Sequence, residues 1–290
     1  SKQYSKFLKA YASAGTVFLT ESMLPAFAVK RRSGTRVVQL WHGSGAFKKW
    51  GYSTLDKSFG ASRKSVERFP MHNCYTLVPV SSPEVIPHWA SAFNCDPSII
   101  KPLGVPRTDE FFDGVPPKSE KKTILYAPTF RGNNVNLAHN DDVLDIEALK
   151  ESLGSSYTLL LKMHPFVKKS IKIPESCKGF CLDISDMPTN EALKMADILI
   201  TDYSSIIFEY SLLGRPMVFY AYDLESYLSE RDFYYPYESF VPGPIAKTQD
   251  SLVDTILSLG NDTDTSAFAD KYMSACDGHS TERIISELGF

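Results

Sequence analysis

The sequence predicts an α/β fold with parallel sheets, divided into two domains. Short apolar runs rich in β-branched residues alternate with segments of helical periodicity along most of the chain. A stretch rich in Pro, Gly and charge at 113–122 interrupts this alternation and is typical of a linker. Because 43% of the 290 residues are hydrophobic, the chain can bury the cores of two medium domains. We therefore expect one α/β domain over 1–115 and a second over 116–290.

The strand-like runs support this division in chain order. The run at 36–41, for example, reads RVVQLW and is bounded by polar residues, as a buried strand would be. A helix is predicted over 142–154, where Gly154 is a natural C-terminal stop. The predicted strands are 15–20, 36–41, 75–81 and 99–104 before the linker, and 123–129, 157–164, 179–184, 197–202 and 216–221 after it.

The charge is divided unevenly along the chain, although its net value is only −3. Residues 1–70 contain thirteen Lys or Arg against three acidic residues, whereas the remainder contains 18 against 31. Such a basic end indicates an anionic partner, either membrane phospholipid or nucleic acid, unless the charge is only a solvated surface. The acidic remainder would repel a phosphate backbone, which argues against nucleic acid.

Neither a membrane-spanning segment nor a metal site is expected. The apolar stretch 16–29 is interrupted by Glu21 and Pro25, and it is shorter than the roughly 18–20 residues that a spanning helix needs. Five scattered cysteines form no C-x-x-C pair, which is typical of a reducing compartment, and no histidine lies at ligand spacing from Cys177 and Cys181. The chain begins with Ser and nothing in it resembles a signal peptide, so we expect a trimmed chain or an internal fragment.

Candidate ligand-binding residues follow the predicted strand 197–202. Ligands of open α/β sheets bind at the carboxyl ends of the strands. The sequence TDYSS at 201–205 leads from that strand into an apolar helix, whose free N–H groups and dipole favour an anion. The alternative is that Asp202 or Ser204 only caps the helix. The predicted phosphate cradle consists of Thr201, Asp202, Ser204 and Ser205, with Glu209 reaching a ribose hydroxyl.

Further polar residues stand at three other strand ends. An Arg side chain, here Arg131, suits bidentate contact with phosphate. A single histidine is more often structural than catalytic, but His42 in WHGSGAFKKWG and His164 in KMHPF both stand where a strand enters a loop beside Gly or Pro. The candidate residues at the ends of 123–129 and 157–164 are Thr129, Arg131, Gly132, Lys162, His164 and Pro165.

Six sequence blocks occur in a familiar order. They are WHGSGAFKKWG (41–51), GVPRTDEFF (104–112), ILYAPTFRG (124–132), KMHPF (162–166), ADILITDYSSIIFEYSLLGRPMVFY (196–220) and DGHSTERI (277–284). Over roughly residues 35–285 the chain thereby resembles the CDP-glycerol glycerophosphotransferase family, whose members build wall teichoic acids and related polymers. The resemblance implies a GT-B architecture, in which two Rossmann-like domains face a central cleft and the C-terminal domain holds the nucleotide. Only some 35 residues precede the WHG block, so we expect either an N-terminal domain that has lost upstream strands or a compact one.

The resemblance also implies residue roles. His42 would be the general base that takes the proton of the acceptor hydroxyl as this attacks the β-phosphorus of CDP-glycerol. Arg131, His164 and the helix start at Ser204 and Ser205 would meet the charge that develops on the departing CMP. No D-x-D motif is present, so neither a metal ion nor another cofactor is expected. The resemblance also implies that Ser280 and Thr281, in the DGHST block, are further phosphate ligands of the donor. The other substrate contacts that it implies are Gly43, Arg107 and Glu209.

The predicted function is the transfer of glycerol phosphate from CDP-glycerol to an undecaprenyl-diphosphate-linked saccharide or a growing polymer. We expect a peripheral enzyme on the cytoplasmic face of the membrane, with the basic first 70 residues and Phe47, Trp50 and Tyr52 facing the anionic bilayer or acceptor. One alternative is CDP-ribitol as donor. Another is a GT-B glycosyltransferase or UDP-sugar epimerase, although these tend to carry TDSGG-like loops where this chain has TDYSS. The third is a polymer- or lipid-binding module without turnover, against which the two histidines argue.

Overall fold

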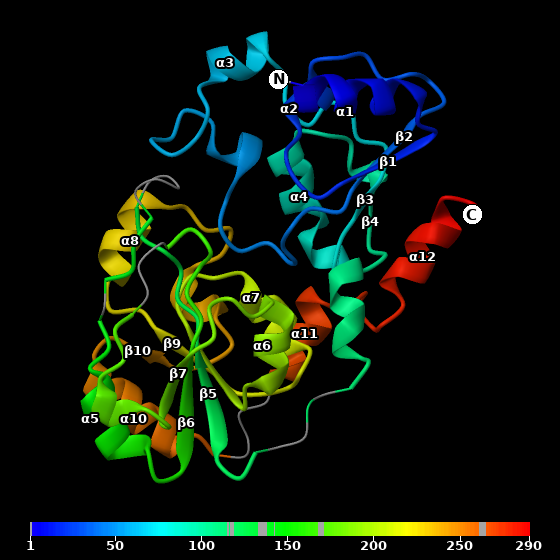
Figure 1. Ribbon diagram of the computed structural model, residues 1–290. Helices are drawn as coiled ribbons and strands as arrows, with labels where there is room; N and C mark the ends of the chain where they lie inside the picture. The colour runs from blue at the N-terminus through cyan, green and yellow to red at the C-terminus, as the bar shows by residue number, and fades with distance from the viewer. Residues whose placement is uncertain are drawn as a thin grey trace. The chain divides into compact units, whose positions relative to one another are not determined.

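The computed structural model describes residues 2–114, 116, 119–132, 138–141, 143–167, 171–260 and 265–290, and the chain divides into two compact units (Figure 1). The first unit is formed by Ser1–Phe112, Glu230–Tyr234 and Lys271–Phe290, and the second by Asp113–Ser229 and Tyr235–Asp270. The break after Phe112 lies near the expected boundary, but residues 271–290 belong to the first unit and not to the second, where we expected them. Part of the predicted linker and residue 142 of the predicted helix lie outside the described residues.

The second unit contains a six-stranded sheet in which every neighbouring pair is parallel. Its order is β10-β9-β8-β5-β6-β7, which is the doubly wound order of a Rossmann fold. The order reverses between β5 and β8, and ligands of such sheets bind beyond the carboxyl ends of the strands at that point. The strands are β5 (Lys122–Tyr126), β6 (Tyr157–Leu161), β7 (Cys181–Asp183), β8 (Ile198–Thr201), β9 (Met217–Tyr220) and β10 (Ile245–Ala246).

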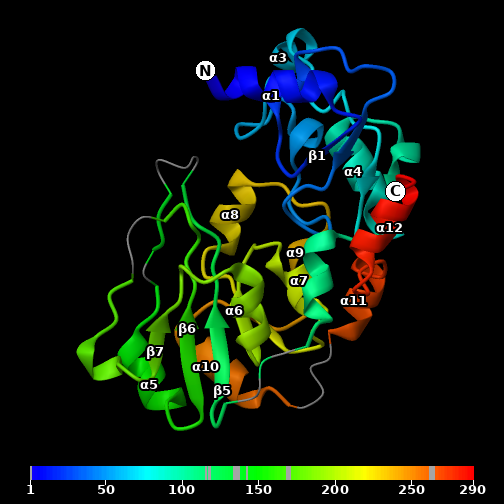
Figure 2. The same ribbon diagram turned by 45° about the vertical axis from the view of Figure 1, so that its right-hand side comes forward.

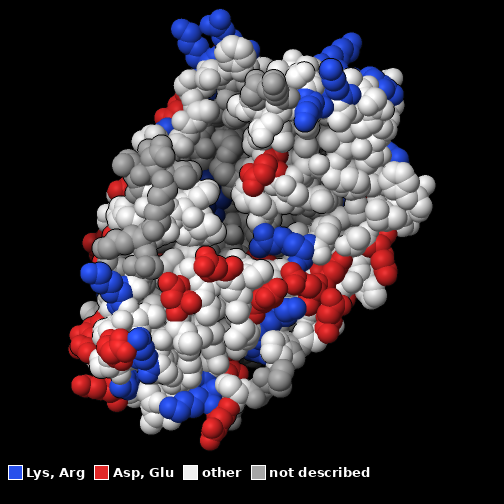
Figure 3. All heavy atoms as spheres, in the orientation of Figure 1, with Lys and Arg blue, Asp and Glu red and all other residues white. Residues whose placement is uncertain are grey.

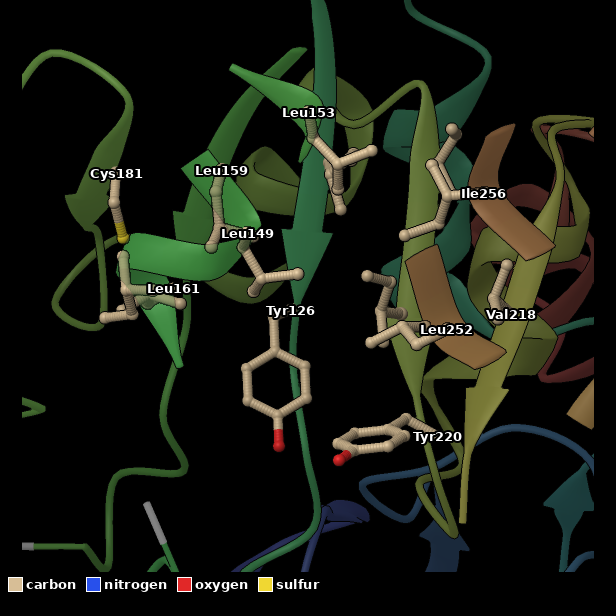
Figure 4. Close-up of a cluster of buried hydrophobic side chains, with 14 of the residues drawn as sticks. Tyr126, Leu149, Leu153, Leu159, Leu161, Cys181, Val218, Tyr220, Leu252 and Ile256 are labelled. Carbon is tan, nitrogen blue, oxygen red and sulfur yellow. The ribbon is translucent and has the colours of Figure 1, made fainter. Parts of the chain in front are cut away.

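Helices cover both faces of this sheet (Figure 2). Side chains alternate between the two faces of a strand, so one set of apolar residues packs against α5 and α10 and the intervening set packs on the opposite side. Figure 4 shows Leu149 and Leu153 of α5 and Leu252 and Ile256 of α10 packed over strand residues such as Leu161. The helices are α5 (Ile146–Leu153), α6 (Thr189–Met195), α7 (Ile206–Ser211), α8 (Leu224–Glu230), α9 (Tyr237–Phe240) and α10 (Gln249–Ser258), with the 3-10 turn η6 (Glu175–Cys177).

The first unit is built on four short parallel strands. The strands β1 (Thr16–Leu19) and β2 (Arg36–Gln39) pair with each other, as do β3 (Val78–Pro79) and β4 (Ile100–Lys101). A bridge between Val38 and Leu77 joins the two pairs. The helical segments are α1 (Lys2–Ser13), α2 (Leu24–Phe27), α3 (Arg63–Arg68), α4 (Ile86–Phe93) and α12 (Ser280–Glu287), with the 3-10 turns η1 (Gly51–Thr54), η2 (Pro83–Val85), η3 (Pro97–Ile99) and η4 (Pro106–Phe111). The helix α11 (Ser266–Tyr272) begins in the second unit and ends in the first.

An aromatic cluster fills the first unit beside α4. The rings of Trp41 and Trp50 stack with centroids 4.8 Å apart, and Phe93 packs edge-on against both of them. His72 joins the cluster with only 4% of its surface exposed, and its Nδ1 lies 2.8 Å from the Tyr75 hydroxyl. Burial lowers the pKa of His72 to about 4, so the imidazole is neutral near pH 7.

The C-terminal helix α12 completes the first unit. Ile284 and Leu288 pack with Val38 and Leu77 in one apolar cluster. At the start of α12, the Asp109 carboxylate accepts hydrogen bonds from the backbone of the first turn. These long-range contacts explain why residues 271–290 group with the first unit. Contacts between residues so far apart in the sequence cannot be predicted from hydrophobic periodicity, which is a local pattern.

All of the predicted strands are present, although most are shorter than the apolar runs that predicted them. The two-residue strand β10 was not predicted, because so short a run has no measurable alternation. Within the described part of the chain, no helix is both long and apolar enough to cross a membrane.

Candidate functional site

His42 stands at the exit of β2, in the loop predicted from the sequence. Because β1 and β2 are parallel neighbours, the residues that follow them emerge at one edge of the sheet. Thr20 and Glu21 follow β1, and Trp41 and His42 follow β2. Trp41 has a φ of 58°, a left-handed conformation that is uncommon for residues other than glycine, and its ring stacks on His42 with centroids 4.4 Å apart.

The His42 ring has oxygen atoms on one side. Its Nδ1 lies 3.4 Å from the Thr20 carbonyl oxygen and 3.6 Å from Oε2 of Glu21. Both oxygens are acceptors, so the neutral ring that fits them carries its proton on Nδ1. Nε2 then holds the lone pair, and with 53% of the side chain exposed it can accept a proton from a bound hydroxyl group.

Two other predicted residues of the first unit lie beside His42. Gly43 follows it in the chain, and Arg107 of η4 donates a hydrogen bond from Nη1 to the His42 carbonyl oxygen. The guanidinium thereby brings positive charge next to the loop. The structure places these three residues together, as the sequence blocks implied.

In the second unit, a small cavity of about 60 Å³ lies beyond the carboxyl ends of β5, β6 and β8. This is the point where the strand order reverses. Four predicted residues share it: Lys162, His164, Pro165 and Ser204. The remaining lining residues are Leu125, Ala127, Pro128, Met163, Thr189, Leu193 and Ile206.

The two basic side chains of this cavity have different surroundings. Lys162 is 7% exposed, and its Nζ donates to the carbonyl oxygens of Ser185 and Met187 at 3.2 and 2.6 Å. Burial lowers the pKa of Lys162. His164 accepts a hydrogen bond at Nδ1 from the backbone N–H of Phe166 at 3.2 Å, so the proton of its neutral ring is on Nε2. His164 can therefore donate to an anion, whereas Lys162 fixes the loop before α6.

Arg131 does not have the environment that we predicted for it. Its Nε and Nη2 donate to the Asp223 carboxylate at 2.7 and 3.0 Å, and Nη2 also lies 3.0 Å from Oδ2 of Asp202. Nη1 donates to the carbonyl oxygen of Thr129 at 2.6 Å. With 11% of the side chain exposed, the guanidinium is an internal link between the strand-end loops. This geometry does not support contact of Arg131 with phosphate.

The remaining residues of the predicted cradle are mostly buried. Thr201 is fully buried, and its hydroxyl donates to the carbonyl oxygen of Ala127 at 2.7 Å. Asp202 is also buried, and its carboxylate forms an ion pair with Arg131. Glu209 is also fully buried, in the first turn of α7, which does not fit a ribose contact. Ser205 stands at the start of α7.

Beside them, Thr129 and Gly132 flank Arg131 at the end of β5. The Thr129 hydroxyl is buried without a hydrogen-bond partner among the described residues. Gly132 has a φ of 104°, in the region that favours glycine. The buried Thr129 hydroxyl therefore has donor capacity that no described protein group uses.

Ser280 and Thr281 fall in the first unit, apart from the donor-binding set that we expected them to join. Their backbone N–H groups donate to the Asp109 carboxylate at 2.9 and 2.8 Å, and the Thr281 hydroxyl donates to it at 2.7 Å. An internal carboxylate therefore occupies the anion site that we assigned to phosphate.

Three residues of the two sites were not predicted. Glu21 contacts His42, and Asp223 binds Arg131. Gln39 makes hydrogen bonds to the backbone of Glu21 and of Trp41. Glu21 directly follows the predicted strand 15–20, and this position could have marked it as a candidate site residue. Among the residues whose positions are described, no group of three or more His, Cys, Asp or Glu side chains is arranged to hold a metal ion.

Comparison with known proteins gives consistent matches along the whole chain. A teichoic acid ribitol-phosphate primase of Bacillus spizizenii is 43% identical over 94% of this chain and 74% of its own length. A teichoic acid glycerol-phosphate primase of Bacillus subtilis is 31% identical over 93% of this chain and 72% of its own length. Three ribitol-phosphate polymerases of Bacillus spizizenii and Staphylococcus aureus are 37% or 38% identical, and the chain spans only 47% to 59% of their length.

Solved structures confirm the GT-B fold class. A structure of the wall teichoic acid polymerase TagF superposes with a TM-score of 0.82 at 24% identity, over 98% of this chain and 75% of TagF. A UDP-N-acetylglucosamine 2-epimerase of Listeria monocytogenes shares the fold at a TM-score of 0.58 and 13% identity, over 99% of this chain and 77% of its own. The sequence model of CDP-glycerol:poly(glycerophosphate) glycerophosphotransferases matches residues 2–288. The chain therefore belongs to this glycerophosphotransferase family, and its relatives include teichoic acid primases and polymerases.

Proposed function

We propose that this protein transfers an alditol phosphate from a CDP-alditol to a hydroxyl group of a lipid-linked saccharide or growing polymer and releases CMP. The observation that carries this proposal is the 43% identity, over nearly the whole chain, to a teichoic acid primase. The acceptor would be a saccharide linked to undecaprenyl diphosphate. One unit or many could be added, since primases and polymerases both occur among the relatives.

The sequence led us to expect CDP-glycerol as the donor, whereas the more similar relatives are ribitol-phosphate enzymes. Ribitol-phosphate enzymes are 37% to 43% identical to this chain, whereas the glycerol-phosphate primase of Bacillus subtilis is 31% identical. We therefore propose CDP-ribitol as the preferred donor. CDP-glycerol is the second candidate, because the family description and the glycerol-phosphate relatives point to it.

In this proposal His42 is the general base. The lone pair on Nε2 takes the proton of the acceptor hydroxyl, the oxygen bonds to the β-phosphorus, and the bond to the CMP oxygen breaks in line. On the donor side, the Nε2–H of His164, the Thr129 hydroxyl and the N–H groups near Ser204 would meet the phosphate oxygens. No step in this scheme uses a metal ion.

The basic first unit supports a place for the enzyme on a membrane. In the view of Figure 3, Lys and Arg side chains gather over α3, and over α1 and the connection that follows β1. Phe69, at the end of α3, is 66% exposed and Leu24 of α2 is 64% exposed. Basic residues beside exposed apolar ones suit the anionic surface of a cytoplasmic leaflet, so we propose peripheral binding there.

The test is to incubate the protein with CDP-ribitol or CDP-glycerol and an undecaprenyl-diphosphate-linked disaccharide, and then to measure CMP release and product mass. We expect CMP release with a mass gain of one or more alditol phosphates, faster with CDP-ribitol, and unchanged activity after treatment with EDTA. The His42→Ala variant should lose turnover by about 10²–10⁴-fold with little change in nucleotide affinity. The matched variant His164→Ala should lose affinity as well as rate. Turnover of a UDP-sugar, or nucleotide binding without CMP release, would contradict the proposal.

A further inference from the structure

We propose that Glu21 is a positioning residue for His42, and that the buried amide of Gln39 holds the two segments that carry this pair. This inference rests on the proposed function, in which His42 is the base. Glu21 and His42 belong to different segments, which follow the neighbouring parallel strands β1 and β2. The pair therefore exists only as long as those two segments keep their spacing.

The contact between the two side chains is made at one ring nitrogen. Oε2 of Glu21 lies 3.6 Å from Nδ1 of His42, which is a charge contact at a distance too long for a hydrogen bond. The Thr20 carbonyl oxygen, at 3.4 Å from the same nitrogen, is the nearer acceptor. Two acceptors on this side favour the tautomer with the proton on Nδ1, and only that tautomer presents a lone pair at Nε2.

Gln39 joins the two segments through its side-chain amide. Oε1 accepts a hydrogen bond from the backbone N–H of Trp41 at 2.9 Å. Nε2 donates to the carbonyl oxygen of Glu21 at 3.2 Å. The side chain is fully buried, so these bonds do not exchange with water. One amide thus fixes the backbone next to His42 and the backbone of Glu21 itself.

A further layer fixes the orientation of the Gln39 amide. Nε2 of Gln39 also donates to the Tyr75 hydroxyl at 2.8 Å, and that hydroxyl lies 2.8 Å from Nδ1 of His72. Because His72 is neutral, its Nδ1 can accept the Tyr75 proton. Tyr75 is then an acceptor toward Gln39, which places the NH₂ group of Gln39 on that side and its oxygen toward Trp41.

The carboxylate has a function at the moment of proton transfer. When Nε2 takes the acceptor proton, the ring becomes an imidazolium with a positive charge shared between its nitrogens. Glu21 stabilises that charge from the Nδ1 side. Arg107 donates a hydrogen bond to the His42 carbonyl oxygen and so brings positive charge next to the same loop. Both side chains of the pair are more than half exposed, so solvent screening keeps the effect of Glu21 moderate.

Three variants separate charge from hydrogen-bond acceptance. Glu21→Ala removes both, whereas Glu21→Gln keeps an acceptor oxygen and removes only the charge. We expect kcat to fall about 3–30-fold in Glu21→Ala, with KM for the CDP-alditol within about twofold of the wild-type value, and to be intermediate in Glu21→Gln. Glu67→Ala is the matched control, because Glu67 is an exposed carboxylate of the same unit on α3 and should leave kcat unchanged.

A double variant tests whether Glu21 acts through His42. In the His42→Ala background, adding Glu21→Ala should change kcat by less than about twofold, because the group it acts on is absent. An equal loss in both backgrounds would show that Glu21 contacts substrate or only maintains the fold. A raised KM with unchanged kcat would also overturn the proposal.

The tautomer of His42 gives a readout that does not need turnover. ¹⁵N NMR of the imidazole at about pH 8, with the signal assigned by its loss in His42→Ala, should show the proton mainly on Nδ1 in the wild type. The population with the proton on Nε2 should rise in Glu21→Ala, and also in Gln39→Glu, which keeps the acceptor for Trp41 but loses the donor to Glu21. An unchanged tautomer in all variants overturns the positioning role. If no CDP-alditol is turned over, the proposed function fails, whereas this measurement still decides the inference.

Discussion

Two buried polar side chains, Gln39 in the first unit and Arg131 in the second, each join loops that follow neighbouring strands. Most of the polar atoms of both side chains have partners. Buried polar networks of this kind stabilise one arrangement of a loop, because any other arrangement leaves a donor or acceptor unpaired. In both units, one buried side chain therefore sets the geometry of the loops that follow two neighbouring strands.

His72 makes the stability of the first unit depend on pH. Its pKa is about 4 in the folded protein because of burial, and near 6.5 in an unfolded chain. Between these values the unfolded chain binds a proton that the native protein does not, so stability is complete above about pH 6.5 and is lost as pH falls toward 4. We expect a loss of up to about 3 kcal/mol. Urea unfolding at pH 7.5, 6 and 5, followed by tryptophan fluorescence, would measure it, since Trp41, Trp50 and Trp89 all lie in this unit.

The controls for this prediction are two other histidine variants. His72→Phe should be less stable at pH 7.5, because the Tyr75 hydroxyl loses the acceptor of its proton, but its stability should vary less between pH 7.5 and 5. His279→Gln should keep the wild-type dependence, because the His279 side chain is exposed and contacts Glu282 at the surface. A dependence that persists unchanged in His72→Phe would assign the effect to another group.

How far the site could be predicted depends on sequence separation. His42 and His164 were found because each directly follows an apolar strand. The pairing of Arg131 with Asp223 spans 92 residues, and neither residue has a local feature that names the other as its partner. The prediction of Arg131 as a phosphate ligand did not foresee this pairing for that reason.

At the scale of elements, the N-terminus of α12 is tied to η4. Burial raises the pKa of Asp109, but the hydrogen bonds from Thr281 and Ser280 outweigh this and leave it below its ordinary value. The bonds are charge-assisted and also satisfy the first free N–H groups of the helix. Asp109 therefore ties the N-terminus of α12 to η4, while Ile284 and Leu288 hold its apolar face.

Asp109→Asn should lower the free energy of unfolding of the first unit by about 1–2 kcal/mol at pH 7. Because the folded pKa is depressed, the wild-type advantage is present above the unfolded pKa near 3.9 and is lost as pH falls through the folded pKa. Chemical unfolding followed by tryptophan fluorescence at several pH values checks both statements. Glu282→Gln is the matched variant, since Glu282 is an exposed acid in the same first turn, and it should cost less. Equal losses would contradict a special role for Asp109.

The strands were predicted more reliably than their lengths. A run such as TILY in β5 is apolar because the sheet is covered on both faces, and such a run is recognisable in any sequence. β3 and β4 have only two residues each, so the longer apolar runs around them include loop residues that pack in the core. Burial and strand pairing are different properties, and only burial leaves a compositional signal.

At the scale of the whole molecule, the basic first unit leads to a prediction on membranes. Binding to vesicles should strengthen with the fraction of anionic lipid and weaken as salt is raised, because the screening length is about 8 Å at physiological ionic strength. Replacing Lys64 and Arg68 of α3 by Gln should weaken binding several-fold in a sedimentation assay. The pair Lys172→Gln and Lys178→Gln, in the second unit, is the matched control and should have little effect. Equal binding to neutral and anionic vesicles would show that the basic residues are only a solvated surface.

The return of residues 271–290 to the first unit has a consequence for synthesis on the ribosome. Bacterial and eukaryotic domains usually fold in the order in which they are translated, the N-terminal one first. Here Ile284 and Leu288, which cover Val38 and Leu77, are made after every strand of the six-stranded sheet. The N-terminal half of the nascent chain therefore waits with part of its apolar surface uncovered, while the six-stranded sheet, whose segments are all made earlier, can already form. The order of folding is then the reverse of the order of synthesis.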